Sequence, residues 1–168
     1  MQISMYTASV PRLINGLTNL SHILGKAQAH AEAKKIDPVV FANLRLFPDM
    51  FPLSRQVQIA CDVAKGLVAR LAGVDIPAYE DTEKDLHELQ ARIAKTIAFL
   101  ETFKPEQIDG TEDKDIVVKR GDKETHYKGM QFLLGHGLPN LHFHTTTTYC
   151  MLRASGVEVG KSDYLGKI

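Results

Sequence analysis

The sequence predicts an all-α fold, a four-helix bundle that carries a small β-hairpin before its last helix. Apolar residues recur at steps of three and four in four separate segments, which is the spacing that lines one face of a helix. Between the third and fourth segments stands a run of β-branched residues followed by a turn-like stretch, which is typical of a hairpin. With 168 residues the chain is expected to form a single domain over residues 1–168.

The first helix is expected near residues 4–34, because its apolar residues form one continuous seam. The seam consists of Val10, Leu13, Leu17, Leu20, Leu24, Ala27 and Ala31. Pro11 suits the first turn of a helix, where its missing N–H costs little, and Ser9 is the expected cap. The pattern ends at residues 36–38, Ile-Asp-Pro, since the residue before a proline resists the helical conformation.

Residues 38–52 are expected to form a long connection with one short helix at 38–45. Two prolines in its second half argue against a continuous helix. Its aromatic side chains, Phe41, Phe47 and Phe51, are expected to fold back onto the core.

The second and third helices are expected at residues 53–72 and 82–103. The apolar stripe of the second is Val57, Cys61, Ala64, Val68 and Leu71, and that of the third is Leu86, Leu89, Ile93, Ile97, Leu100 and Phe103. Gly73 is a natural terminator for the second helix. Thr82 with Asp85 resembles a capping box and would open the third.

The hairpin is expected near residues 115–128, with Ile116 to Val118 in one strand and a turn at 120–123. The last helix, near 129–155, is the ambiguous one. Residues 141–149 alternate as a strand would and contain four consecutive threonines, which favour β structure locally. Helical spacing of the apolar residues persists through the same segment, so we predict a helix, kinked at Pro139.

Composition excludes several classes of function. Twenty basic residues balance twenty acidic ones, so the excess of positive charge that nucleic-acid binding requires is absent. The apolar runs are too short to span a membrane, and the N-terminal residues do not resemble a secretory signal. Cys61 and Cys150 are far apart and form no CxxC pair, so they are expected to be free thiols in a reducing compartment, the cytoplasm.

Histidines on the last helix are the first candidates for a site. His136, Asn140 and His144 stand at i, i+4 and i+8 and share one stripe of a helix. His142 is excluded from that stripe, because two residues along a helix turn the side chain by about 200°. His144 is expected to be buried, with either a hydrogen-bond partner on the second helix or a metal as its contact.

The second helix supplies the other candidates. Arg55, Gln58, Asp62 and Lys65 lie to one side of its apolar stripe. We expect Gln58 and Asp62 to face a polar pocket together with the last helix. The alternative for this polar face is a solvated surface or a contact between subunits.

Several strings in the chain resemble those of one known family. They are RLFPDMFPL at 45–53, QVQIA at 56–60, AKG at 64–66, LPN at 138–140, FH at 143–144, LR at 152–153, GV at 156–157 and GK at 160–161. On these strings the chain resembles an uncharacterised bacterial domain-of-unknown-function family within the DinB/YfiT-like superfamily of predicted metalloenzymes. The resemblance implies the DinB-like four-helix bundle, with its helices in up-down-down-up order.

The resemblance also implies a degenerate metal site. Relatives in that superfamily bind a divalent metal through one histidine on the second helix and an HxxxH pair on the fourth. Carried over to this chain, the pair falls on Asn140 and His144, and the second-helix ligand falls within 58–62, where no histidine exists. His144 is thus the one metal ligand that the resemblance retains. Some relatives are thiol-dependent transferases or isomerases, and relatives often form dimers.

Two functions are therefore expected from the sequence. The first is a binding module that takes an unknown small molecule in a pocket around Asn140, His144, Gln58 and Asp62, without a metal. The alternative is a metal-dependent, thiol-dependent transferase or isomerase, in which His144 and either Asp62 or Gln58 hold a divalent metal. A homodimer is expected in both cases, and neither a nucleic acid nor a membrane is expected as partner.

Overall fold

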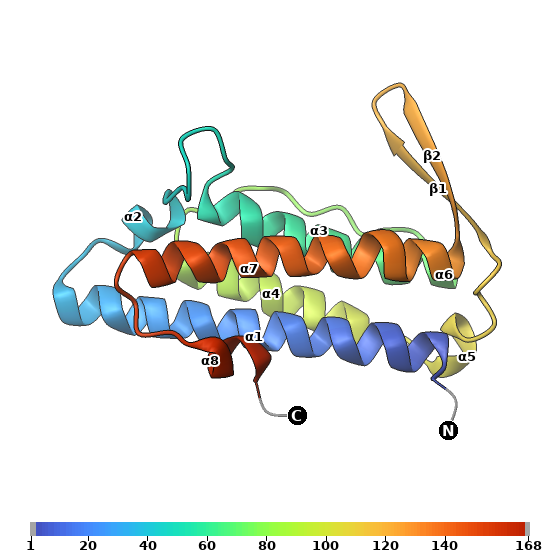
Figure 1. Cartoon of the computed structure of the whole chain (residues 1–168), viewed down its shortest axis with the longest axis horizontal. Helices are drawn as coiled ribbons and strands as arrows, with labels where there is room; N and C mark the ends of the chain where they lie inside the picture. Colours follow the sequence, from blue (N-terminus) through green and yellow to red (C-terminus); the bar gives the residue numbers. More distant parts are fainter. Residues whose placement is uncertain (1–2, 167–168) are drawn as a thin grey trace.

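Four long helices lie side by side and form most of the molecule (Figure 1). They are α1 (Met5–Lys34), α3 (Leu53–Ala72), α4 (Leu86–Leu100) and α7 (Leu138–Ala154). The structure is a computed structural model that describes residues 3–166. The helices α1 and α7 run in one direction, and α3 and α4 run in the opposite one (Figure 1). The prediction of an all-α chain with a small hairpin before the last long helix is confirmed.

The apolar seams predicted from the sequence form the core between these helices. Leu17 of α1, Val57 of α3, Leu89 of α4 and Leu141 of α7 are all buried in one cluster. At about 25 cal/mol per Å² of apolar surface, burying such side chains is the main favourable term in folding.

The first helix begins earlier than its predicted cap. Ser4 is the N-cap, and its hydroxyl accepts a hydrogen bond from the backbone N–H of Thr7. Ser9, the expected cap, is instead buried inside the helix and donates its hydroxyl to the carbonyl of Met5 at 2.6 Å. The helix extends back because Met5 is itself buried in the core, one turn before the seam that the sequence shows.

The connection at 38–52 leaves the core after its first turn. It starts with the short helix α2 (Pro38–Ala42), and Phe41 of that helix is buried as expected. The expectation for the other two aromatic residues is wrong: Phe47 is 63% exposed and Phe51 is 57% exposed. The side chain of Arg45 donates a hydrogen bond to the backbone carbonyl of Met50, so this loop is held by a contact within itself rather than by contacts with the core.

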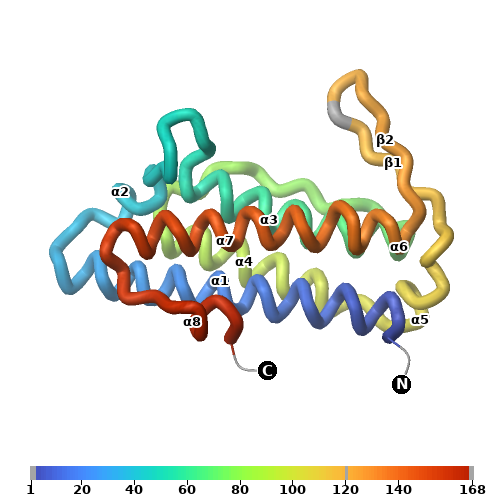
Figure 2. The backbone as a smooth tube through the Cα atoms, viewed as in Figure 1, coloured from blue at the N-terminus to red at the C-terminus, as the bar shows by residue number. Residues whose placement is uncertain are grey.

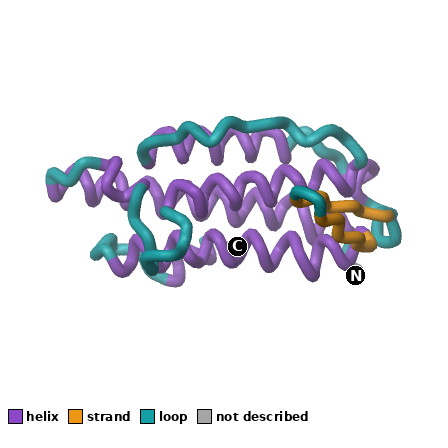
Figure 3. The backbone as a smooth tube through the Cα atoms, turned by 90° about the horizontal axis from the view of Figure 1, so that it is seen from above, coloured by secondary structure: helices purple, strands orange, loops and turns teal. Residues whose placement is uncertain are grey.

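A second connection, residues 73–85, runs along the length of the helices (Figure 3). Because α3 and α4 point in the same direction, the chain must return to the other end before α4 can begin. The predicted start of the third helix at residue 82 is wrong, because residues 82–85 belong to this connection. The helix α4 begins at Leu86 instead, because Asp85 is the N-cap and accepts from the backbone of Glu88 at 2.9 Å.

The hairpin stands away from the helices (Figure 2). It follows the single turn α5 (Pro105–Ile108) and consists of β1 (Asp115–Arg120) and β2 (Lys123–Lys128), paired antiparallel. Ile116 is buried and pairs with Tyr127, and this pair anchors the base of the hairpin.

The last helix is continuous but changes its pitch. A short α6 (Gly129–Phe132) leads into the π-helical turn η1 (Leu133–Gly137), which leads into α7. The N–H of Leu138 reaches the carbonyl of Leu133, and this wider turn brings Pro139 into the helix without the break that proline otherwise causes.

Residues 141–149 form a helix rather than a strand because the threonine hydroxyls find hydrogen-bond acceptors within the helix itself. The hydroxyls of Thr145, Thr147 and Thr148 each donate to the carbonyl four residues earlier, at 2.7–3.0 Å. All three side chains are buried. Because their hydroxyls are bonded within the helix, this polar stretch can pack against the core. No helix among residues 3–166 has the length and apolar character needed to cross a membrane.

Candidate functional site

A pocket of about 400 Å³ opens between α3, α7 and the hairpin. Its walls combine charged, polar and aromatic side chains from four parts of the chain. The lining residues include Phe51, Arg55, Asp62, Arg70, Lys119, Phe132, His136 and Asn140. A pocket of this size is at the lower end of those that hold small organic molecules.

The pocket contains two of the four predicted site residues. Asp62 of α3 and Asn140 of α7 both line it, and both are half-buried. Gln58 and His144 are buried and do not line it. His136, which shares a helix stripe with Asn140, lies in the wall and stacks on Phe132 with ring centroids 5.4 Å apart.

Asp62 is fixed by two cations from outside the pocket. Arg92 of α4 and Lys65 of α3 each approach its Oδ1 at 3.0 Å. Arg92 also holds Asp81 and Glu83 of the 73–85 connection, each at 3.0 Å, with its own side chain only 2% exposed. The carboxylate of Asp62 is therefore already paired with two cations before any ligand enters the pocket.

Gln58 belongs to this same network rather than to the pocket. Its amide N–H donates to Glu83 at 2.9 Å, and its oxygen accepts from Arg55 at 3.3 Å. Burial opposes ionisation of Glu83, but the hydrogen bonds from Arg92, its own backbone and Gln58 outweigh it and lower the pKa of Glu83. The 73–85 connection thus covers part of the polar face predicted on the second helix, while Arg55 and Asp62 stay partly exposed, at 37% and 38% of their side chains.

His144 makes the contact with the second helix that the sequence suggests, but with a different residue. Its Nδ1 lies 2.6 Å from Oε1 of Gln56, and the amide nitrogen of Gln56 lies 3.3 Å from the carbonyl of Phe51. Because an amide oxygen only accepts, Nδ1 of His144 is the donor. Both side chains are buried, so this hydrogen bond joins α7 to α3 inside the core.

The residues do not fit the three-histidine metal centre that the resemblance implies. Nowhere in residues 3–166 do three or more His, Cys, Asp or Glu side chains gather as a metal would require. His144 faces an amide on α3, and Asn140 stands where the other histidine of the pair would be. Amide groups are poor substitutes for imidazole at a zinc-type centre.

Neither cysteine supplies a reactive thiol to the pocket. Both are free, and Cys61 is fully buried on the apolar side of α3. Burial raises the pKa of Cys61 to about 12, and the hydrogen bond with Thr96 offsets only part of that rise. A thiol in this state remains protonated at neutral pH and packs as a small apolar side chain.

His144→Ala is expected to lower the free energy of unfolding by about 1–2 kcal/mol, because it leaves the buried Gln56 oxygen without its donor. The loss should be the same with chelator and with added Mn²⁺, Ni²⁺ or Zn²⁺. Chemical denaturation measures it, with the exposed His87→Ala on α4 as control. A metal-dependent rise in melting temperature that only the wild type shows would contradict a purely structural role for His144.

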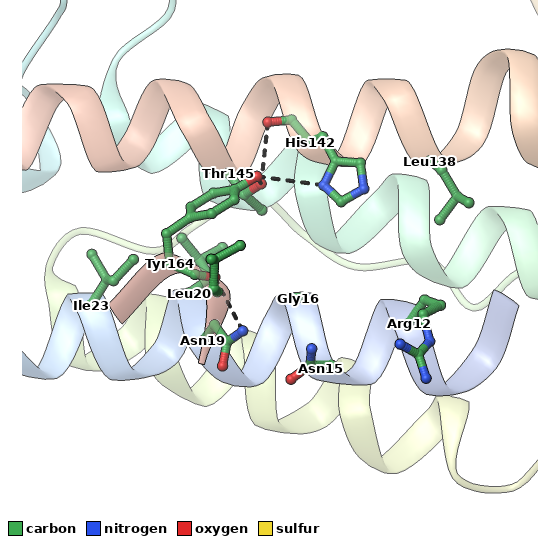
Figure 4. A pocket seen from close by; sticks show the side chains of 11 residues that line it. Arg12, Asn15, Gly16, Asn19, Leu20, Ile23, Leu138, His142, Thr145 and Tyr164 are labelled. Carbon is green, nitrogen blue, oxygen red and sulfur yellow. Dashed lines mark hydrogen bonds between the residues drawn. The ribbon is translucent and has the colours of Figure 1, made fainter. Parts of the chain in front are cut away.

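A second, smaller pocket of about 230 Å³ lies between α1, α7 and the C-terminal α8 (Lys161–Leu165) (Figure 4). Three of its polar side chains are bonded to one another: the Tyr164 hydroxyl lies 3.2 Å from the hydroxyl of Thr145 and 3.4 Å from Nδ1 of His142. Asn19 of α1 donates to the carbonyl of Tyr164 at 3.1 Å. These bonds dock the C-terminal segment against α1 and α7.

Comparisons with known proteins place the chain in a family. The model of a domain of unknown function, DUF1993, matches residues 5–165. A crystal structure of a DinB family member protein from Shewanella denitrificans is 43% identical to the chain, with a TM-score of 0.88. The similarity covers 97% of this chain and 92% of that one. No curated protein matches.

The family match extends over nearly the whole length of the chain, from the first turn of α1 to the last residue of α8. The resemblance inferred from the sequence strings is thereby confirmed. The protein is a DinB-like member of the DUF1993 family.

Proposed function

We propose that the chain is a single-domain binding module that takes a small molecule in the pocket between α3, α7 and the hairpin. In this proposal residues 1–168 form one DinB-like four-helix bundle in up-down-down-up order, with a degenerate metal site. The convergence of Arg55, Arg70, His136 and Asn140 on one pocket of about 400 Å³ carries the proposal. Convergent polar groups in an aromatic-walled hollow are what small-molecule sites share.

These side chains fit a binding function better than a catalytic one. The carboxylate in the pocket, Asp62, is held by Arg92 and Lys65. Asn140 makes no side-chain hydrogen bond to any residue in 3–166, so its amide is available to a ligand. An amide can orient a bound molecule by donating and accepting hydrogen bonds, but it does not act as a general acid or base at neutral pH.

Asn140→Leu is expected to abolish binding of small molecules at this pocket, because leucine removes the hydrogen-bonding amide and keeps the volume filled. A screen of a metabolite collection against ¹⁵N-labelled protein would detect ligands by shifts of resonances around the pocket. Asn15→Leu, in the wall of the second pocket, is the matched control and should retain those shifts. Ligands that shift the same resonances equally in Asn140→Leu would contradict the proposal.

We further propose a cytoplasmic homodimer. Both cysteines are free, which suits a reducing compartment. The connection at 38–52 exposes apolar side chains that a second copy could cover; these are Val39, Val40, Leu46, Phe47 and Phe51. Light scattering should give twice the chain mass of 18.7 kDa, and Phe47→Ser should shift it toward the single-chain value. A wild-type mass of one chain at micromolar protein would reject the dimer.

A further inference from the structure

We propose that the pocket between α3, α7 and the hairpin selects an organic anion, with Arg70 as the group that binds its carboxylate or phosphate. The inference rests on the proposed binding function and adds the chemical class of the ligand. It follows from the charges in the wall, from the state of Arg70 and from the apolar surfaces beside it.

The wall of the pocket carries more positive than negative charge. Arg55, Arg70 and Lys119 line it together with a single carboxylate, that of Asp62. Asp62 is already paired with two cations, Arg92 and Lys65, and neither of these lines the pocket. Because Asp62 is already occupied, the charge that a ligand meets is set by whichever cation of the wall has no acidic partner of its own.

Arg70 is the cation of this wall that lacks an acidic partner. Nη1 of Arg70 donates to the carbonyl of Gly66 at 2.9 Å. No carboxylate in residues 3–166 lies within ion-pair distance of its guanidinium. The guanidinium carbon lies 5.9 Å from the centre of the Phe132 ring, and burial lowers the pKa of Arg70. A partly desolvated charge without a counter-ion is costly, and a bound anion would relieve that cost.

The other two cations of the wall are already engaged. Arg55 pairs with Asp81 and donates to Gln58, and Lys119 pairs with Glu124 across the hairpin at 2.6 Å. Their charges are offset by these carboxylates, so neither is free to bind the ligand directly. This leaves Arg70 as the direct contact, and its planar fork of donors matches the oxygens of a carboxylate or a phosphate.

The other side chains of the wall indicate the chemical character of the rest of the ligand. Phe51 offers exposed apolar surface, Phe132 adds a buried ring to the wall, and the amide of Asn140 offers a polar contact. A molecule that fits has an anionic end near Arg70 and an apolar or aromatic body that reaches the rest of the wall. The volume of about 400 Å³ limits it to a small organic acid or a small phosphate monoester.

The experiment compares probes of one size and different charge: benzoate, phenyl phosphate, benzamide and benzylammonium. Their dissociation constants for the full chain are measured by NMR titration, following resonances of the residues that line the pocket. Benzoate or phenyl phosphate should bind more tightly than benzamide, and benzylammonium should not bind. The stronger of the two anions identifies whether a carboxylate or a phosphate is preferred.

Arg70→Gln should weaken binding of the preferred anion about tenfold or more, the usual worth of a charge-assisted hydrogen bond. Arg12→Gln, an exposed arginine of the second pocket, is the matched control and should leave the affinity unchanged. If Arg70→Gln does not fold, Arg70→Lys replaces it; lysine keeps the charge but lacks the planar fork of donors, so a smaller loss of anion affinity is expected, and an unchanged affinity would count against Arg70 as the direct contact.

The outcomes separate the inference from the proposed function. If benzamide binds the pocket as tightly as the anions do, the pocket remains a ligand site and selection for an anion is wrong. The same holds if Arg70→Gln is folded and binds anions as the wild type does. If no probe of any charge shifts the pocket resonances, both the anion selectivity and the ligand site are rejected.

Discussion

Replacing Arg92 with methionine is expected to lower the free energy of unfolding by about 3 kcal/mol. In the wild type this buried guanidinium holds Asp62, Asp81 and Glu83. Methionine fills a similar space but leaves three carboxylates without their common cation. Breaking a buried ion pair costs about 3–5 kcal/mol, and the lower end applies because Asp62 and Asp81 are 38% and 40% exposed and partly screened by solvent.

The effect should depend on pH in a defined direction. The pKa of Glu83 is lowered in the folded protein, so the stability it contributes is present above its ordinary value of 4.5 and is lost as the pH falls through the lowered folded pKa. Arg92→Met should remove most of that dependence. Urea denaturation at neutral pH and at acidic pH measures both effects.

The matched control is Lys95→Met, an exposed cation on the same helix, whose Nζ lies 4.2 Å from the centre of the Tyr79 ring. Loss of an exposed cation–π contact should cost at most about 1 kcal/mol. If Arg92→Met and Lys95→Met unfold at the same urea concentration, the network around Arg92 does not hold the 73–85 connection in place.

The long helices could be predicted from the sequence because burial imposes a period on their residues. The helices at 4–34 and 53–72 are found almost at their predicted ends, and so is the hairpin at 115–128. In each case a local signal was sufficient: an apolar seam with its terminating glycine or proline for the helices, and β-branched residues followed by a turn for the hairpin. Where two local signals competed, as at 141–149, the threonine hydroxyls decided for helix through bonds that a strand does not offer.

The 73–85 connection could not be predicted because its contacts are non-local. Lys65 donates to the carbonyl of Pro77 and lies 3.9 Å from the centre of the Tyr79 ring, and Arg92 reaches the connection from α4. One signal was present in the sequence: Arg92 stands between Leu89 and Thr96, at positions of α4 that face the core. A charged residue at such a position indicates a buried partner, but the sequence does not say which one.

The candidate site shows the same limit at the level of single side chains. A buried histidine bonded to the second helix was foreseeable for His144, yet its partner is Gln56 rather than Gln58 or Asp62. Two residues along a helix change the direction of a side chain by about 200°. Fixing that direction requires knowing how α3 is rotated against α7, and this rotation is set by packing of the whole core.

Gly129→Ala is expected to destabilise the protein by about 2–3 kcal/mol, since overpacking a tight contact costs this much and backbone cannot move aside as a side chain can. An alanine Cβ at position 129 would stand 1.9 Å from the carbonyl oxygen of Thr111. The segment around Thr111 is also held to the start of α6 by the hydrogen bond from the N–H of Met130 to the carbonyl of Glu112 at 2.9 Å. Making room for the methyl group would stretch this bond and move the hairpin off the start of α6.

Gly135→Ala, in the π-helical turn η1 that continues α6, is the matched control. A Cβ at position 135 meets nothing within 4 Å, and alanine is better than glycine inside a helix by about 0.5–1 kcal/mol. The two substitutions should therefore change the melting temperature in opposite directions, although each adds one methyl group to a glycine of the same segment. Equal melting temperatures for the two variants would show that the contact between Gly129 and Thr111 does not constrain the base of the hairpin.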